Sequence, residues 1–241
     1  ITADEFTAIT QYMNYKYCNE TGISQREYYK RRVYALVYTI HHYTGCRTKE
    51  LLNLKWRHIT INPNDNAFDR KTNRIVHIPA DNSKTGRSRD IIAPIGQQIE
   101  RLIRWYREMG LEVDQKSDRY VFPRLTDTTK NENIPTSDVA WTKRLRNVLA
   151  SAERDGVIDL NGRNISNYCA RHHHITEAIQ RGVDIYDIAL NCGTSLNYIE
   201  KTYSHITTLM RSRDITKGLG RQATYDPRKD EEYLKATRMG E

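Results

Sequence analysis

The sequence predicts an α+β fold that is mainly α-helical and carries one small antiparallel β-sheet. Three observations support this: helix-capping patterns near the N-terminus, two short β-like runs around a turn, and glycines that close amphipathic segments in the second half. The chain has 241 residues, of which 38% are hydrophobic and 28% are charged. This length and composition suit one large or two small domains with a real core.

Helices are expected to begin early in the chain. Thr2 with Glu5, and Ser24 with Glu27, form S/T-x-x-E capping boxes, in which side chain and backbone satisfy each other's hydrogen bonds. After the second box, apolar residues recur at helical spacing, which predicts one buried face. These residues are Tyr29, Val33, Leu36, Val37 and Ile40.

The pattern changes after a short predicted helix at residues 48–54. Residues 62–73 are rich in turn-forming residues, so we expect a loop there. Residues 74–80 and 89–95 are typical of short strands, and the turn residues of 81–86 lie between them. This arrangement predicts a β-hairpin and therefore an antiparallel sheet.

Helices are predicted again from residue 97 onward. Residues 97–110, 137–156 and 171–182 each end on a glycine, which is typical of a helix C-cap. A short helix is expected at residues 183–192, followed by another that Ser195 could cap.

Composition excludes several classes of protein. No apolar run is long enough to cross a bilayer, and the N-terminus lacks the features of a signal peptide. The chain does not begin with Met, so we expect it to be part of something longer. Four scattered cysteines without a C-x-x-C pair argue against a zinc site or a disulfide framework and favour a reducing, intracellular setting. The net charge of +8 moderately favours an anionic partner, first of all nucleic acid.

Arg47 lies just after Gly45, with Glu50 three residues further along the predicted helix. A guanidinium held beside an acid at a helix start suits phosphate binding. From these residues alone, however, an ordinary surface Arg–Glu pair is the favoured interpretation.

Arg171 is followed by three histidines, His172, His173 and His174. Consecutive residues on a helix point in different directions, so the three rings cannot converge on one metal ion. We therefore expect no metal here, and a solvated or core-edge role for at least two of the rings.

Lys84 lies at the tip of the predicted hairpin, with Arg87 and Arg89 close by in sequence. Cations at hairpin tips often contact a nucleic-acid backbone, although a solvated turn is the simpler interpretation.

Taken together, these segments resemble the catalytic domain of the tyrosine recombinases, specifically phage-type integrases. The resemblance extends from about Thr2 to Ile206. The matching motifs, in order, are TGCRTKELLNLKW, SKTGRSRDIIAPI, YCARHHHIT, GVDIYDIALNCGTS and IEKTYSHI.

The resemblance implies a set of catalytic roles. Arg47 and Arg171 would bind the scissile phosphate and stabilise the charge of its transition state. Lys84 would donate a proton to the departing 5′ oxygen, and Tyr203 would be the nucleophile that forms a 3′-phosphotyrosyl link. Tyr198, five residues earlier, falls on a different face of its helix. No metal, nucleotide or other cofactor is implied.

Other site residues follow from the same resemblance. Glu50 and His172 would support the site. The family usually has His where this chain has Tyr168, and His or Trp where it has Thr194. Both hydroxyls can donate hydrogen bonds, but neither is a useful base at neutral pH.

The implied function is site-specific recombination of DNA, as in the integrases of phages and mobile elements. The expected partner is a double-stranded recombination site, bound by a homo-oligomer, a tetramer on DNA, in the cytoplasm of a host cell and without a membrane. The alternatives are a catalytically weak DNA-binding regulator on the same fold and a relaxing enzyme of the type IB topoisomerase kind.

The resemblance also implies a domain organisation. Residues 1–220 would form the catalytic domain, and the charged tail 221–241 could dock on a neighbouring protomer. The N-terminal DNA-binding domains that such integrases usually carry are not visible in this chain.

Overall fold

The computed structural model describes residues 2–125 and 130–210, without the side chains of 130–133 and 205–210. The chain divides into two compact units, Ile1–Tyr203 and Ser204–Glu241, and the first contains the hydrophobic core and both sheets. The predicted tail, 221–241, and its boundary near residue 220 lie outside the described residues.

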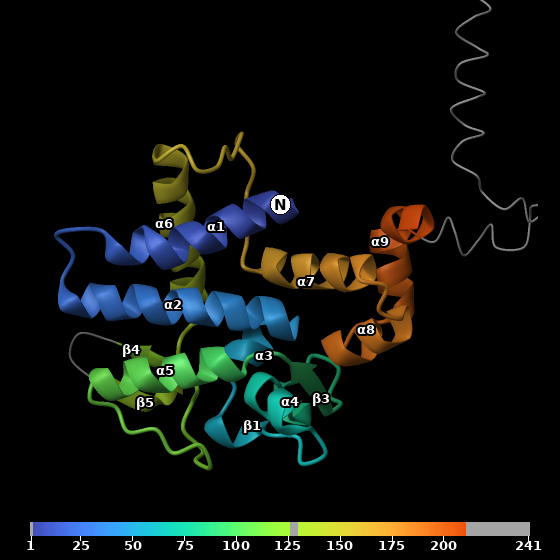
Figure 1. The fold of residues 1–241 in the computed structure, drawn as a ribbon, viewed down its shortest axis with the longest axis horizontal. Coiled ribbons are helices and arrows are strands. Elements are labelled where there is room, and N and C mark those ends of the chain that lie inside the picture. The colour runs from blue at the N-terminus through green and yellow to red at the C-terminus, as the bar shows by residue number, and fades with distance from the viewer. Residues whose placement is uncertain (1, 126–129, 211–241) are drawn as a thin grey trace, which may run out of the picture. The chain divides into compact units, whose positions relative to one another are not determined.

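Helices dominate the described chain, as predicted (Figure 1). Their bounds are α1 Ala3–Tyr15, α2 Gln25–Thr44, α3 Thr48–Leu52, α4 Ala67–Thr72, α5 Gly96–Glu108, α6 Asp138–Arg154, α7 Tyr168–Gln180, α8 Ile185–Cys192 and α9 Leu196–Met210. Short 3₁₀ turns occur at η1 Tyr17–Asn19, η2 Trp56–His58 and η3 Ala80–Asn82. Within the described residues, no helix is both long and apolar enough to cross a membrane.

The predicted N-caps of the early helices are confirmed. The Thr2 hydroxyl accepts a hydrogen bond from the Glu5 backbone at 3.1 Å, and the Glu5 carboxylate accepts one from the Thr2 backbone at 2.8 Å. Ser24 caps α2 through the Glu27 N–H at 3.2 Å. These bonds satisfy donors that the first helical turn leaves unpaired.

Helix α2 forms the centre of the core, and α1, α5 and α7 pack against it (Figure 1). Burial is continuous from Val33 to Tyr38, so it extends beyond the single face that the sequence predicts. A helix enclosed by neighbours on several sides buries residues all round. The ring of Tyr34 also meets Trp141 of α6, with centroids 4.3 Å apart.

The predicted hairpin is present as strands β2 (Arg74–Ile78) and β3 (Arg89–Ala93). They pair antiparallel, with Val76 opposite Ile91, and β1 (Ile59–Thr60) adds a third strand beside β2. Apolar side chains alternate along both strands and bury one face of the sheet.

Two features differ from the prediction. The expected loop 62–73 contains the short helix α4, because the Asn66 side chain accepts hydrogen bonds from the N–H groups of Phe68 and Asp69. A second sheet, β4 (Pro123–Leu125) with β5 (Lys130–Pro135), was not predicted. Neither strand shows the apolar alternation that identifies a strand, so only tertiary pairing reveals them.

Candidate active site

The C-terminus of α2 binds Arg171, the second of the two arginines predicted to bind phosphate. Gly45 ends this helix with φ +57°, and its carbonyl oxygen accepts a hydrogen bond from Arg171 Nη1 at 2.6 Å. A Cβ at Gly45 would lie 2.3 Å from the His174 ring, so both the conformation and the space require glycine.

The C-terminus of α8 holds both arginines. Gly193 ends α8 with φ +63°. Its carbonyl accepts from Arg47 Nη2 at 2.7 Å, and the preceding carbonyl, of Cys192, accepts from Arg171 Nη1 at 2.7 Å. Since the two guanidiniums bind consecutive carbonyls, the structure brings Arg47 and Arg171 together although 124 positions separate them in the sequence.

This geometry has an electrostatic cause. The last carbonyls of a helix lack partners within the helix and carry its negative dipole end. Two such ends, from α2 and α8, meet at the arginines. They stabilise positive charge without neutralising it, which leaves that charge available to an anion.

Glu50 is the buried carboxylate residue of the site. It is 1% exposed and binds two arginines: Arg47 Nη1 at 2.8 Å, and Arg89 through Nη2 at 2.6 Å and Nη1 at 3.2 Å. The Arg47 backbone N–H also donates to it, at 2.9 Å. Burial works against the charged form, but the bonds from Arg89 and Arg47 prevail and lower the pKa of Glu50 below its ordinary value.

The interpretation of Arg47 and Glu50 as a surface pair is therefore wrong. Glu50 is buried and Arg47 is half-buried, because α3 packs into the core and because β3 supplies Arg89, neither of which local spacing shows. We call Arg47, Glu50, Arg89 and Arg171 the arginine cluster.

Arg89 is the member of this cluster that the sequence did not assign to the site. The sequence placed it at the start of a strand, close to a hairpin tip that was interpreted as a solvated turn or a nucleic-acid contact. Instead it points inward, and its Nε donates to the Asn191 carbonyl at 3.3 Å. A signal was available, because side chains alternate along a strand and Arg89 shares a face with Ile91 and Ala93, both fully buried.

Tyr203 lies on α9, whose first turn is capped by Ser195 as predicted. It is 4% exposed, and its hydroxyl lies 2.5 Å from His172 Nδ1. Burial, together with Tyr198 and Tyr168, raises the pKa of Tyr203, whereas burial and the charge of Arg171 lower the pKa of His172. A protonated phenol thus meets a neutral imidazole that can accept its proton.

Tyr168 lies beside this pair. Its ring is edge-on to the His172 ring at 4.8 Å, and the Arg171 guanidinium lies 6.0 Å from its centroid. Burial and a hydrogen bond with Tyr168 raise the pKa of Tyr198. Tyr168 therefore joins the predicted site and forms hydrogen bonds there, but it does not replace the missing imidazole.

Thr194 directly follows Gly193. Its backbone N–H donates to the Ala189 carbonyl at 3.0 Å and so closes α8 in a Schellman-type cap. Its half-buried side chain lies next in sequence to the carbonyl that holds Arg47.

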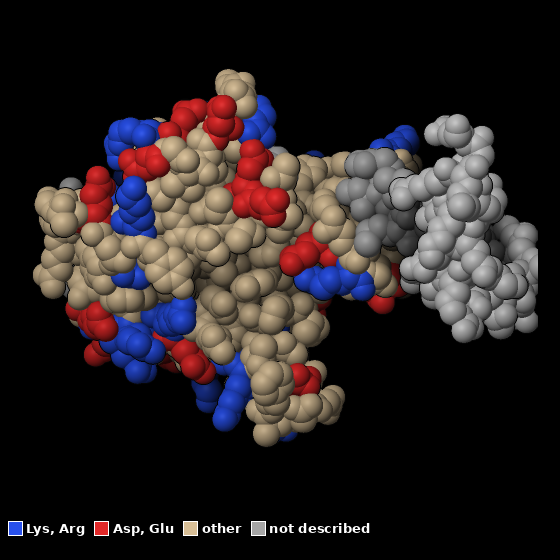
Figure 2. Space-filling view, turned by 45° about the horizontal axis from the view of Figure 1, so that its top comes forward, with Lys and Arg blue, Asp and Glu red and all other residues tan. Residues whose placement is uncertain are grey.

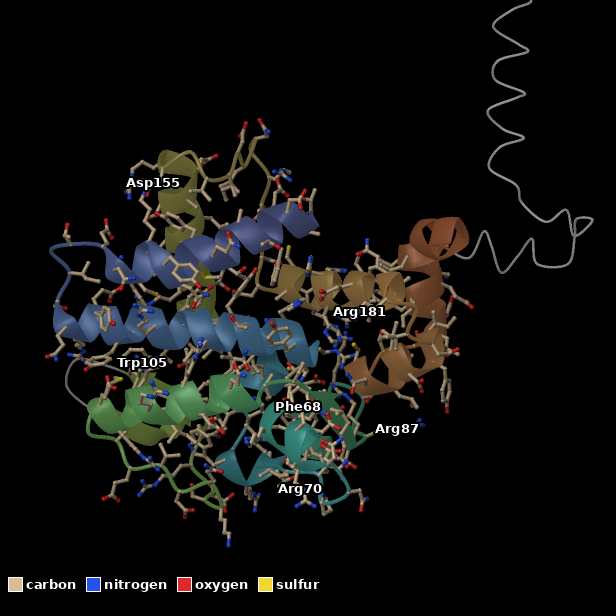
Figure 3. The ribbon with its side chains drawn as sticks, in the orientation of Figure 1. Phe68, Arg70, Arg87, Trp105, Asp155 and Arg181 are labelled. Atoms are coloured by element: carbon tan, nitrogen blue, oxygen red, sulfur yellow. The ribbon has the colours of Figure 1, made fainter. Side chains whose placement is uncertain are left out.

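Lys84 is not brought to the cluster. It is exposed on the loop between η3 and β3, and it forms no hydrogen bond or ion pair with residues of the described ranges. Arg87, on the same loop, is also exposed (Figure 3). The structure therefore positions the two arginines and the tyrosine but leaves the predicted general acid in solvent.

The three consecutive histidines face different neighbours. His172 meets Tyr203, His173 stacks on Phe6 with centroids 4.2 Å apart, and His174 lies against Gly45. Burial lowers the pKa of His174 to about 3. The four cysteines, Cys18, Cys46, Cys169 and Cys192, are free thiols.

On the face that Figure 2 displays, basic and acidic side chains are interspersed, without one continuous basic patch. The side chains of the arginine cluster lie largely below the surface.

Comparison with known proteins identifies a family for the chain. The model of the phage integrase family matches residues 1–209. No curated protein matches the chain by sequence.

Solved structures with a similar fold are site-specific recombinases and integrases. XerH bound to its difH substrate has a TM-score of 0.58 at 17% identity, over 91% of this chain and 53% of that one. The Tn1549 transposon integrase with transposon right-end DNA has a TM-score of 0.58 at 13% identity, over 91% and 66%. XerA recombinase has a TM-score of 0.54 at 17% identity, over 92% and 65%.

The chain thus spans between about half and two thirds of the length of these proteins. The family match covers most of the chain, and the solved structures share its fold. The chain belongs to the phage integrase family, and its fold is that of the tyrosine recombinase catalytic domain.

Proposed function

We propose that this chain cuts and rejoins DNA through a covalent 3′-phosphotyrosyl intermediate, with Tyr203 as the nucleophile. The substrate would be double-stranded DNA. XerH was solved bound to its difH substrate and the Tn1549 integrase in complex with transposon right end DNA. A homo-oligomer on DNA, a tetramer, would carry out strand exchange.

One observation carries the proposal. Arg171 is 1% exposed, and its Nε is buried without a hydrogen-bond acceptor. Among the described residues, no carboxylate pairs with it, and only backbone carbonyls hold its Nη1. A buried cation without a counter-ion is costly, so the site favours an anion such as a phosphodiester.

The proposed cleavage step would use Arg47, Arg171, His172 and Tyr203, together with an acid. The Tyr203 oxygen attacks phosphorus, and its proton passes to His172 Nδ1. The bond from phosphorus to the 5′ oxygen breaks, and the 5′ hydroxyl leaves with a proton from an acid. Arg47 and Arg171 stabilise the charge on the non-bridging oxygens, and no metal or nucleotide takes part.

Lys84 is proposed as that acid. Because it is exposed on the loop before β3, this role requires the loop to close on bound DNA. General acid catalysis by a positioned side chain typically contributes about 10²–10⁴-fold in rate, so Lys84→Ala should slow cleavage by a factor in that range.

A second function remains, supported by one observation. Tyr203 is 4% exposed and bonded to His172, so its hydroxyl is covered in this conformation. A chain that kept Tyr203 covered on DNA would be a catalytically weak DNA-binding regulator.

The two functions separate in a covalent trapping assay. A nicked suicide substrate that carries the recombination site is incubated with the chain and run on a denaturing gel, and binding is measured in parallel by gel shift. We expect a covalent band that Tyr203→Phe abolishes. Tyr198→Phe, on the same helix and also close to Tyr168, is the matched control and should keep the band.

Binding without a covalent band in the unmodified chain would favour the regulator. A band that survives Tyr203→Phe but is lost in Tyr198→Phe would move the nucleophile to Tyr198. Phosphate contacts should make binding strongly salt-dependent, and an affinity insensitive to salt would contradict phosphate recognition by the arginine cluster.

A further inference from the structure

Three potential metal ligands lie together between α2 and α7, apart from the arginine cluster. They are His42 of α2, and His173 and Glu177 of α7. The two residues of α7 are four positions apart and therefore share a helix face. His42 Nε2 lies 3.1 Å from Glu177 Oε2, and one donor atom of each residue lies within 4.8 Å of the others. The prediction of no metal considered only whether His172, His173 and His174 could bind one ion together. It did not consider His173 together with Glu177 and with His42 of another helix.

The three side chains line a cavity of about 740 Å³. The Glu177 side chain is 39% exposed, whereas that of His42 is 8% exposed. A hydrated ion therefore has a path to the site, and the more exposed carboxylate can move to meet it.

We propose that His42, His173 and Glu177 bind a divalent cation of the zinc class. Two imidazoles and one carboxylate, with water as the fourth ligand, form a common coordination set for Zn²⁺. With ligand bonds of roughly 2.0–2.1 Å, two donors of a tetrahedral site lie about 3.4 Å apart, close to the spacing of His42 and Glu177. His173 Nδ1 lies 3.4 Å from His42 Nδ1 and not beside the Nε2 that faces Glu177, so the His173 side chain must rotate to bring a nitrogen to the ion.

Neighbouring groups orient the two rings. His42 also forms a hydrogen bond with the backbone of Ala170, the kind of outer contact that fixes the orientation of metal-binding imidazoles. Phe6 packs against both rings, with centroids 4.6 Å from His42 and 4.2 Å from His173. The opposing interpretation is that these contacts form an aromatic and polar cluster that needs no ion.

A bound ion would connect the two helices that position Arg171. Helix α2 ends at Gly45, whose carbonyl holds Arg171, and α7 carries Arg171 itself. The ion would thus stabilise the fold next to the site without touching the reacting groups, and the inference does not depend on the proposed function.

The test uses the whole chain, Co²⁺ as a spectroscopic probe and Zn²⁺ as its competitor. We expect one equivalent of Co²⁺ to give the visible d–d absorption of a tetrahedral site, and Zn²⁺ to abolish that absorption and raise the Tm. His173→Ala and Glu177→Gln should each weaken Co²⁺ binding by roughly tenfold or more. Circular dichroism would check that each variant is folded, and Glu177→Gln, at an exposed position, keeps the test valid if His173→Ala fails to fold.

His77→Ala is the matched control. His77 Nδ1 pairs with Asp90 at 2.7 Å on the sheet, and no third ligand completes a site there in the described residues. This variant should bind Co²⁺ as the unmodified chain does. The proposal fails if no d–d absorption develops, if Glu177→Gln binds as tightly as the unmodified chain, or if a thiolate charge-transfer band shows that cysteines bind the metal.

Discussion

The arginine cluster and the Lys84 loop both carry positive charge that the proposed function assigns to a DNA phosphate, but the structure holds their side chains in opposite ways. In the arginine cluster, Glu50 and the carbonyls at two helix ends fix the guanidiniums in place. On the loop, Lys84 is exposed and forms no hydrogen bond or ion pair with other described residues. Under the proposed function, the phosphate-binding groups are preorganised by folding, whereas Lys84 would be positioned by the loop closing on DNA.

The largest effect on stability is expected from Glu50→Ala. It would leave Arg47 and Arg89 without their buried acid, and breaking a buried ion pair typically costs about 3–5 kcal/mol. Urea unfolding would measure the loss.

Asp118→Ala is the control for this comparison. Asp118 also binds two cations, Lys55 and Arg57, but its side chain is 66% exposed. Exposed pairs contribute about 0–1 kcal/mol. Equal losses in the two variants would show that the arginine cluster is no more tightly organised than the surface.

Gly193→Ala should have the next largest effect. A Cβ there would lie 2.5 Å from Arg89 Cζ and would displace the guanidinium from Glu50, in addition to the strain of φ +63°. Gly156→Ala has a similar φ of +69° but no atom within 4 Å of the new Cβ. The αL conformation costs an L-residue about 1–2 kcal/mol, so both variants should lose that amount and Gly193→Ala clearly more. If Gly193→Ala and Gly156→Ala lowered the free energy of unfolding equally, the clash expected between a Cβ at position 193 and Arg89 would be contradicted.

Acid should destabilise the fold next to the arginine cluster. Burial lowers the pKa of His41 to about 4 and that of His174 to about 3, against about 6.5 in the unfolded chain. Since the folded pKa is the lower one, the unfolded state binds more protons between these values, and stability falls as pH drops below about 6.5. Each of the two histidines contributes up to about 1.4 kcal/mol per pH unit. Urea unfolding at pH 7.5 and 5.5 would measure this, and equal stability at both values would contradict the burial of neutral rings.

The smallest effect on stability is expected from Lys84→Ala. Surface substitutions away from specific contacts usually change stability by less than about 0.5 kcal/mol. The yield of the covalent protein–DNA complex of this variant should nevertheless fall steeply. A large loss of stability would mean that Lys84 has a structural partner, and the contrast between the loop and the arginine cluster would disappear.

The sequence by itself determined much of the local structure. Capping boxes, glycine C-caps and strand alternation are encoded over a few residues, so α1, α2, α5, α6 and the β2–β3 hairpin could be predicted. The order of motifs also predicted the family, which the family match confirms, and it proposed Arg47, Arg171 and Tyr203 as site residues.

Only the tertiary structure decided how these residues meet. Glu50 is buried because α3 enters the core and Arg89 reaches it from another element, and His172 meets Tyr203 because α7 and α9 bring them together. The contact of Arg171 with Gly45 spans 126 positions of the chain. Local patterns cannot encode such a contact, because it depends on packing between elements rather than on the spacing within one.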